Sequence, residues 1–306
     1  MRETMTALQE SIDTFQLLDP KGFLQKFTDD NVRPDGRPLH AARPTTVVKG
    51  VLPRNSYGSA LVRIGETQVL AAITILVGSP GAGSPEHGDV EVRLSVGPLC
   101  SGRYDLSGRV IQTESASSEG GGGSLSDPEA VESFVQRTIR SSEALDLAQL
   151  SIERGRSAWR IRVGLLVLNH DGNLEDSCLL AAVASLSDLK LPRTKVEEDG
   201  VVKIVPGPNP EICAEGGVKL QLRNVPLPLT VGVFDGKMLV DLTAQEEEIC
   251  RGSVTAVVTT GEVVVGLTKL GAARLTATEL AACVTLAFGR AKELEEVVLA
   301  EQVLTP

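Results

Sequence analysis

The residues best suited to chemistry lie in the stretch HDGNLEDSC, which runs from His170 to Cys178. It follows the apolar run IRVGLLVLN, typical of a buried strand, and precedes LLAAVASL, typical of a helix. A strand, a glycine turn and a helix start often bind an anion, because the free N–H groups of the first helical turn point outward and the helix dipole is positive there. Here that turn carries Glu175 and Asp176. The stretch is therefore either an anion site whose cation lies elsewhere or a cradle filled by the protein's own charge.

Further acids lie in DLTAQEEEIC, where Asp241 and Glu247 are six residues apart. Paired carboxylates can hold a metal ion or move a proton. A solvated strand end in an acidic run also explains this pair, and it is the interpretation we favour. For Glu175 and Asp176, favourable interaction with the helix dipole is a sufficient structural explanation.

The arginines form separate groups. Arg160 and Arg162 alternate with Ile161 and Val163, which places both on one strand face. A face with that much charge is either solvated or paired with an acidic neighbour. In the opening RPDGR, we expect Arg33, Asp35 and Arg37 to fix a turn rather than to perform chemistry. Arg103 and Arg109 lie in the polar loop LCSGRYDLSGRV.

Composition restricts the function classes. The chain has 306 residues, a formal charge of −10 and only 3% aromatic residues, so base stacking is not expected as a main mode of nucleic-acid binding. Any RNA contact must come from a local patch or from basic partners. The five scattered cysteines and three distant histidines form no metal motif, and we expect neither a metal nor another cofactor. No run of residues predicts a signal peptide or a membrane span.

The expected elements fall into two similar groups. Asp19 and Pro20 predict the start of a short helix that ends before Asn31, and a hairpin follows with its turn at Gly65 and Glu66. A capping pattern at Ser126 predicts a helix over residues 127–142, and the helix after HDGN has Leu179, Ala182, Val183 and Leu186 on one face. Glycine-rich and serine-rich stretches at residues 78–88 and 113–126 predict surface loops.

The second group repeats this order. Strands joined by Asp-Gly and Thr-Gly turns are followed by a long helix that Thr276 and Glu279 cap. We therefore predict an α+β fold of two similar halves with sheets covered by helices. The expected division is a helical extension at residues 1–30, a first half at 31–195, a linker or hairpin at 196–220, and a second half with the C-terminal helix at 221–306.

An ordered set of sequence pieces resembles the RNase PH family, and among its members the eukaryotic exosome-ring subunits. The pieces are NVRPDGRPLHAARPTTVVKGV, GSALVRIGETQVLAAITIL, VLNHDGNLEDSCLLAAVASL and FDGKMLVDLTAQEEEICRGSVT. They cover roughly residues 20 to 300 in order. The resemblance implies an RNase PH-like fold and a six-membered ring with a central RNA channel.

Active relatives of this family cleave RNA from the 3′ end with phosphate as the nucleophile. They resemble the present junction but read D-G-G-[ST]-R, where the hydroxyl residue and the arginine hold the phosphate. The aligned residues here are Asp171, Gly172, Asn173, Leu174 and Glu175. The family's D-L-x-x-x-x-D pair aligns with Asp241 and Glu247. The resemblance therefore implies a degenerate site without catalytic residues.

The resemblance also suggests partners and alternatives. It implies a non-catalytic ring subunit that supports 3′–5′ RNA processing and degradation, including that of ribosomal RNA, in nucleus, nucleolus and cytoplasm. The expected partners are related ring subunits, cap proteins with oligonucleotide-binding domains, RNA in the channel and associated ribonucleases, without a membrane. Arg103 and Arg109 are RNA-binding candidates, although a solvated loop is an equally good interpretation. An active phosphorolytic enzyme that uses Asp241, Glu247 and Arg103, and an interaction protein independent of RNA, remain alternatives.

Overall fold

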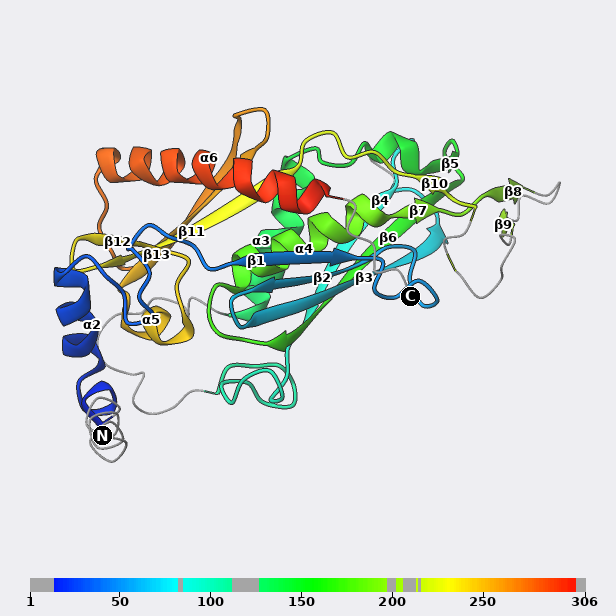
Figure 1. Cartoon of the computed structure of the whole chain (residues 1–306). Coiled ribbons are helices and arrows are strands. Elements are labelled where there is room, and N and C mark those ends of the chain that lie inside the picture. Colours follow the sequence, from blue (N-terminus) through cyan, green and yellow to red (C-terminus); the bar gives the residue numbers. More distant parts are fainter. Residues whose placement is uncertain are drawn as a thin grey trace.

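Two β-sheets, one from each half of the chain, organise the computed structural model (Figure 1). The structure describes residues 14–81, 85–111, 127–196, 202–205, 213 and 216–300. The predicted loop at 113–126 and parts of the loop at 78–88 and of the linker lie outside these residues. Within the described ranges, no helix is long and apolar enough to cross a membrane.

The first sheet has six strands. Its main path runs in the order β1 (Thr45–Lys49), β2 (Ser59–Ile64), β3 (Thr67–Gly78), β6 (Ser157–Asn169) and β4 (Asp89–Ser95), and β5 (Ser151–Glu153) pairs with β6. The β4–β6 pair is parallel and the other pairs are antiparallel. The predicted hairpin is confirmed: β2 and β3 pair from Ser59 with Ala72 to Ile64 with Thr67.

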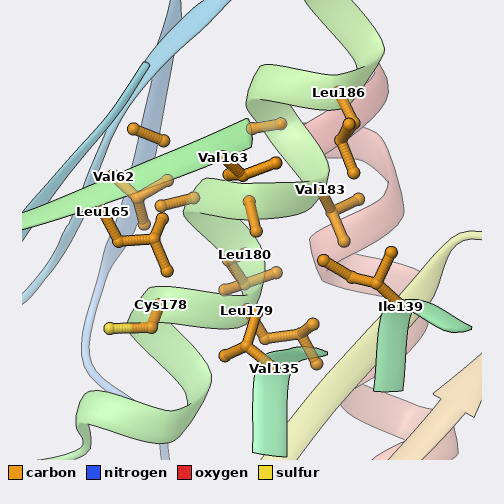
Figure 2. Packing of buried hydrophobic residues seen from close by; sticks show 14 of the residues in the cluster. Val62, Val135, Ile139, Val163, Leu165, Cys178, Leu179, Leu180, Val183 and Leu186 are labelled. Carbon is orange, nitrogen blue, oxygen red and sulfur yellow. The ribbon is translucent and has the colours of Figure 1, made fainter. Parts of the chain in front are cut away.

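Two helices pack against the inner face of this sheet. They are α3 (Pro128–Ser141) and α4 (Leu174–Asp188), and the 3-10 helix η2 (Leu147–Leu150) precedes β5. Figure 2 shows the contact, in which Val135 and Ile139 of α3 lie beside Leu179 and Val183 of α4. Asp127 caps α3 by accepting a hydrogen bond from the N–H of Glu129, whereas the predicted cap Ser126 lies outside the described residues.

The second sheet is smaller and wholly antiparallel. Its order is β12 (Lys237–Val240), β11 (Pro226–Phe234), β13 (Gly252–Thr259) and β14 (Val264–Gly271). The short helix α5 (Ala244–Ile249) connects β12 to β13, and α6 (Ala277–Leu299) runs alongside β11 and β13 (Figure 1). The capping box predicted at Thr276 and Glu279 is confirmed.

In the chain segment that follows α4 and precedes the second sheet, short strands form two small ladders. These are β7 (Lys190–Leu191) with β10 (Val218–Lys219), and β8 (Thr194–Val196) with β9 (Val202–Ile204). The predicted α+β class, with helices covering sheets, is confirmed.

Helix α4 joins the halves, and its burial differs from the prediction. Sequence periodicity assigned it one apolar face, but every residue from Leu174 to Leu186 is buried. The reason is that α4 packs on β2 and β3 along one side and on β11, α3 and α6 along others. A helix enclosed on all sides needs apolar residues all round, so a one-sided pattern is not required.

The N-terminal helix α2 (Pro20–Asp29) belongs with the second half. Its N-cap Asp19 accepts from the Gly22 N–H at 2.9 Å, as predicted. Leu24 of this helix joins a small core cluster with residues of the second sheet and of the segments that flank it, namely Phe234, Leu239, Leu242 and Cys250. Helix α2 therefore packs against the second half, and the chain crosses from it to the first sheet through residues 31–44.

Candidate functional site

The site lies where the start of α4 meets the start of α5. Gly172 has φ +79°, a conformation that favours glycine, and a Cβ atom there would lie 2.5 Å from the carbonyl oxygen of Leu242. Thr67 at the start of β3 anchors the turn, since its hydroxyl donates to the Gly172 carbonyl at 2.7 Å and accepts from the Asp171 N–H at 3.1 Å. The two halves of the chain thus approach each other closely at this turn.

Asn173 stands at the N-cap of α4 with φ 55°, in the left-handed region that asparagine tolerates. Its backbone N–H donates to Glu247 Oε1 at 2.6 Å. Its side-chain amide donates to Asp241 Oδ1 at 2.7 Å and to Asp176 Oδ2 at 2.9 Å. The start of α4 therefore faces carboxylates of the protein itself, which answers the question that the sequence left open.

Asp241 holds the centre of an ion-pair network. Arg43 donates to it from the backbone N–H at 2.7 Å, from Nε at 2.9 Å and from Nη2 at 2.8 Å, and Nη1 of the same side chain reaches the Asp171 carbonyl at 2.6 Å. Burial alone would raise the pKa of Asp241, but the hydrogen bonds and charge of Arg43 hold it below its usual range. Asp241 is only 2% exposed, so its interpretation as part of a solvated strand end is wrong.

Glu247 is not solvated either. Its Oε2 atom is buried and finds no hydrogen-bond partner among the described residues, and the same holds for Oδ1 of Asn173. Burial raises the pKa of Glu247 to about 7, against the opposing effects of the Asn173 N–H and of the Arg103 and Arg43 charges. The carboxyl of Glu247 thus occupies the place at the helix start where an anion would bind.

Leu174, Glu175 and Asp176 are all buried at the first turn of α4. The Thr230 N–H and hydroxyl donate to Asp176 at 3.0 Å and 2.7 Å, and the Thr255 hydroxyl donates to Glu175. The two threonine hydroxyls are also 2.9 Å apart. The acids therefore form a polar contact between α4 and strands β11 and β13, which favourable interaction with the helix dipole alone does not explain.

These two acids are poorly solvated. Burial raises the pKa of Glu175 to about 7, with a further contribution from the neighbouring Asp176 charge, and the Thr255 hydrogen bond opposes the rise. Burial likewise raises the pKa of Asp176 to about 6, although Asn173 and Thr230 donate hydrogen bonds to it. Near neutral pH the cluster therefore holds protons that exposed carboxyls would have released.

The two candidate RNA-binding arginines lie in the loop between β4 and α3, which projects beyond the first sheet in teal in Figure 1. Arg103 Nη2 donates to the Ala244 carbonyl at 2.9 Å and to Glu248 at 2.5 Å, so this side chain is engaged with α5. Arg109 is exposed, and its backbone N–H is bonded to the Asp105 side chain at 2.8 Å. Of the two, Arg109 is the more exposed, whereas Arg103 is half-buried.

His170 precedes the site but has no polar role in it. The residue is 6% exposed, its ring centroid lies 5.7 Å from that of Tyr104, and neither ring nitrogen has a partner among the described residues. Burial, together with the charges of Arg103 and Arg43, lowers the pKa of His170 to about 4. The ring is therefore neutral at physiological pH.

The opening turn also ties the halves together. Arg33 is fully buried, and it donates to both carboxylate oxygens of Glu246 and to the carbonyls of Val240 and Asp241. Arg37 pairs with Asp35 at 2.6 Å and lies 3.5 Å from Asp241 Oδ2. As predicted, these residues stabilise the turn at residues 33–37. They also hold this turn against the end of β12 and the segment that follows it in the second half.

The arrangement leaves little space for a substrate anion. A cavity of about 10 Å³, room for about one water molecule, lies beside Asn173, Asp176 and Asp241. A larger cavity of about 300 Å³ lies near the C-terminal end of α3, where Ile139 and Arg223 are among the residues that line it. Among the described residues, no group of three or more His, Cys, Asp or Glu could hold a metal ion. The geometry suits a closed polar junction.

Sequence reasoning missed the residues that organise this junction. Arg43, Thr230 and Thr255 contact the predicted acids but lie 54 or more positions away from them in the chain. The only available signal for Arg43 was its place before proline, which restricts the backbone but reveals no partner. Asn173 had a detectable signal, since it follows glycine at a predicted helix start.

Comparison with known proteins gives consistent matches along the chain. Residues 41–192 match the model of the 3′ exoribonuclease family, domain 1, and residues 224–290 match domain 2 of the same family. The exosome complex component Rrp42 of Methanopyrus kandleri is 32% identical over 76% of this chain and 78% of its own length. The rrp45 component of Schizosaccharomyces pombe is 28% identical over 89% of this chain and 85% of its own length.

Solved structures agree with the sequence matches. A chain of the Archaeoglobus fulgidus exosome with RNA bound to the active site superposes with a TM-score of 0.72 at 27% identity, covering 92% of this chain and 98% of that one. A chain of an archaeal exosome core superposes with a TM-score of 0.71 at 25% identity, covering 93% and 98%.

Proposed function

Because the chain belongs to the 3′ exoribonuclease (RNase PH) family, we propose that it is a non-catalytic subunit of an RNA exosome core ring. In this role it closes the ring and shapes the channel through which RNA reaches nucleases elsewhere. Its relatives in archaea and fission yeast carry the name of exosome components, which supports the assembly. The expected partners are related ring subunits, cap subunits with oligonucleotide-binding domains, RNA in the assembled channel and associated ribonucleases.

One observation supports the loss of catalysis most strongly. The N–H of Asn173, at the helix start where active relatives hold phosphate, donates to Glu247 at 2.6 Å. A phosphate ion would have to displace this carboxylate and would then face Asp241 and Asp176, which the Asn173 side chain already binds. Like charges a few Å apart in a poorly solvated site repel strongly.

The substituted motif supports the same proposal, for a different reason than the sequence predicted. Glu175 stands where relatives resemble one another in carrying arginine, and the sequence suggested that it repels phosphate directly. In the structure its carboxyl is hydrogen-bonded by Thr255 of β13, while Glu247 fills the cradle. Leu174, in place of the hydroxyl residue, is buried and provides no hydrogen bond to an anion.

The proposal is tested by a phosphorolysis assay. The purified chain is incubated with single-stranded RNA, inorganic phosphate and magnesium, beside an Asp241→Asn variant. We expect the same background of nucleoside diphosphate from both proteins. Release from the natural chain that falls in the variant would support the alternative, an active phosphate-dependent 3′–5′ exoribonuclease.

Several finer points belong to the proposal. Processing of ribosomal RNA and other RNA turnover in nucleus, nucleolus and cytoplasm follow from the expected role. The sequence pieces resemble most the ring subunit called ribosomal RNA-processing protein forty-three, whereas the relatives named above are Rrp42 and rrp45 proteins. We keep the division into residues 1–30, 31–195, 196–220 and 221–306 as a working description.

A further inference from the structure

The outward face of the first sheet carries an uninterrupted row of apolar side chains. Val48 pairs with Leu61, Leu61 with Leu70, and Leu70 with Leu166, so that the row crosses β1, β2, β3 and β6. Leu166 is 45% exposed, and Leu168, two residues along the same strand face, is 42% exposed. At a strand spacing of about 4.8 Å, the row is roughly 14 Å long.

This row departs from what an exposed sheet face requires. Antiparallel sheets with one solvated face normally alternate apolar residues inward with polar residues outward. The inward positions are filled as expected, since Val47, Val62, Val69 and Leu165 are at most 2% exposed. The outward apolar row, in which Val48, Leu61 and Leu70 are half-buried and Leu166 is exposed, is therefore not needed for the core, and contiguous apolar surface open to solvent commonly marks an interaction site.

Arginines border the row on β6 and β4. Arg162 lies 3.2 Å from Glu91, and Arg93 lies 2.7 Å from the same carboxylate. Arg160 is opposite Asp89 in the ladder, but Asp89 binds Arg140 of α3 at 2.9 Å. Among the described residues, Arg160 has no ion pair. The sequence predicted that this face is solvated or paired with an acidic neighbour, and Arg160 is the cation such a neighbour would meet.

The face is suited to protein rather than RNA. Aliphatic side chains offer neither the aromatic stacking nor the hydrogen bonds with which proteins hold single-stranded RNA. The charges on this face are Arg63, Arg93, Arg160 and Arg162 against Glu66, Asp89 and Glu91, so it is slightly basic in a chain whose net charge is −10. A second copy of this face would bring no excess of carboxylates to it, whereas a different acidic subunit would.

We propose that the outward face of the first sheet, centred on Leu166 and Arg160, binds a neighbouring RNase PH-like subunit that presents apolar side chains beside a carboxylate. The inference rests on the proposed function, because its occupant is a ring neighbour. A row of about 14 Å supplies the buried centre of such an interface, and a polar rim must extend over adjoining elements to reach the usual area. Leu166 and Arg160 are then its principal contacts.

Two substitutions test the face, each with a matched control. Leu166→Glu places a charge at the centre of the row, and its control Val264→Glu alters a strand residue of equal exposure, 44%, in the second sheet. Arg160→Glu reverses the unpaired charge, and its control Lys292→Glu makes the same reversal on α6, where the side chain is 74% exposed. Circular dichroism and melting temperature establish that each variant folds.

The measurement is the entry of each variant into the ring. The full-length chain is co-expressed with the other RNase PH-like subunits of its source, one of which carries a tag, and the purified complex is quantified by native mass spectrometry. We expect folded Leu166→Glu and Arg160→Glu to be recovered at least tenfold less than the natural chain, and both controls at its level. Equal recovery of all four variants would overturn the inference while leaving the proposed function intact.

Other outcomes identify other occupants. If the natural chain is absent from the purified ring, the proposed function fails, and the occupant named here fails with it. If the isolated chain forms a dimer that Leu166→Glu dissolves, the face binds a second copy and the inference is wrong. If Arg160→Glu weakens binding of a fluorescent oligoadenylate to the isolated chain but leaves ring entry unchanged, the face binds RNA, and the inference is again wrong.

Discussion

Asn173 and Glu247 determine what the start of α4 can bind. The backbone of Asn173 is left-handed, which aims its N–H at Glu247 and its amide at Asp241 and Asp176. A helix start of this kind binds external anions only when its N–H groups are free. Here the carboxyl of Glu247 accepts from the N–H of Asn173, so the position that an anion would take beside this N–H is filled by the protein itself.

Arg43 is the cation on which this arrangement depends. Replacing it by methionine would leave Asp241 buried without its main partner, and we expect a loss of about 3–5 kcal/mol in the free energy of unfolding. Urea unfolding of the natural chain, Arg43→Met, Asp241→Asn and the double variant measures the coupling. If the two single effects simply add in the double variant, the two side chains are not coupled and the network as described is wrong.

Glu175 makes stability depend on pH. Its pKa is raised from 4.5 to about 7 by burial, so the folded state keeps a proton that the unfolded state releases between these values. Its contribution is fully present below pH 4.5 and is lost as pH rises through about 7, by an amount on the order of 3 kcal/mol.

The test uses Glu175→Gln, which keeps an oxygen for the Thr255 hydroxyl but cannot ionise. Urea unfolding of both proteins at pH 5 and pH 8 gives the change in the free energy of unfolding between these pH values, and this change is compared between the two proteins. We expect the variant to gain stability relative to the natural chain at the higher pH and to match it more closely at the lower. The same change in stability for both proteins would show that Glu175 does not titrate in this range.

At the scale of elements, the turn before α4 lies close to the backbone that leads into α5. Gly172 is required there for two reasons, its positive φ and the approach of the Leu242 and Thr243 backbone. Gly155, in the turn before β6, also has positive φ, at +72°, but nothing lies within 4 Å of a Cβ atom at that position. Substitutions at Gly155 and Gly172 can therefore be compared to separate the cost of backbone strain from the cost of a steric clash.

We expect Gly155→Ala to cost about 1 kcal/mol, the strain of the left-handed conformation alone. Gly172→Ala adds a backbone collision and should cost roughly 3 kcal/mol or more. Denaturant unfolding measures both. Equal losses for the two variants would mean that α5 can move away from α4, and that the halves are less tightly joined at this point than described.

The elements were more predictable than their contacts. Caps such as Asp19 and Thr276 and the hairpin at Gly65 act within a few residues, so local sequence identifies them. Helix α4 was predicted but its full burial was not, because that burial depends on strands of both sheets and on α3 and α6 packing around it. Asp241 was assigned to a solvated end for the same reason: the Arg43 that buries it comes from a distant segment.

For the molecule as a whole, the family fold encloses a junction that is closed by the protein's own carboxylates. Both halves match the family models, and the fold superposes on exosome chains over most of its length. The resemblance predicted which positions are degenerate, whereas the structure shows that Glu247 accepts from the Asn173 N–H and that Glu175 accepts from the Thr255 hydroxyl. Under the proposed function, the chain contributes surfaces, such as the outward face of the first sheet, rather than a reaction.

Titration of the purified chain with inorganic phosphate, followed by calorimetry, tests most directly the claim that the helix start is already filled. The account predicts no saturable binding up to millimolar phosphate, for the natural chain and for Arg103→Gln alike. Saturable binding by the natural chain that weakens in Arg103→Gln would contradict it, because it would show that a free anion site exists and that Arg103 supplies its cation.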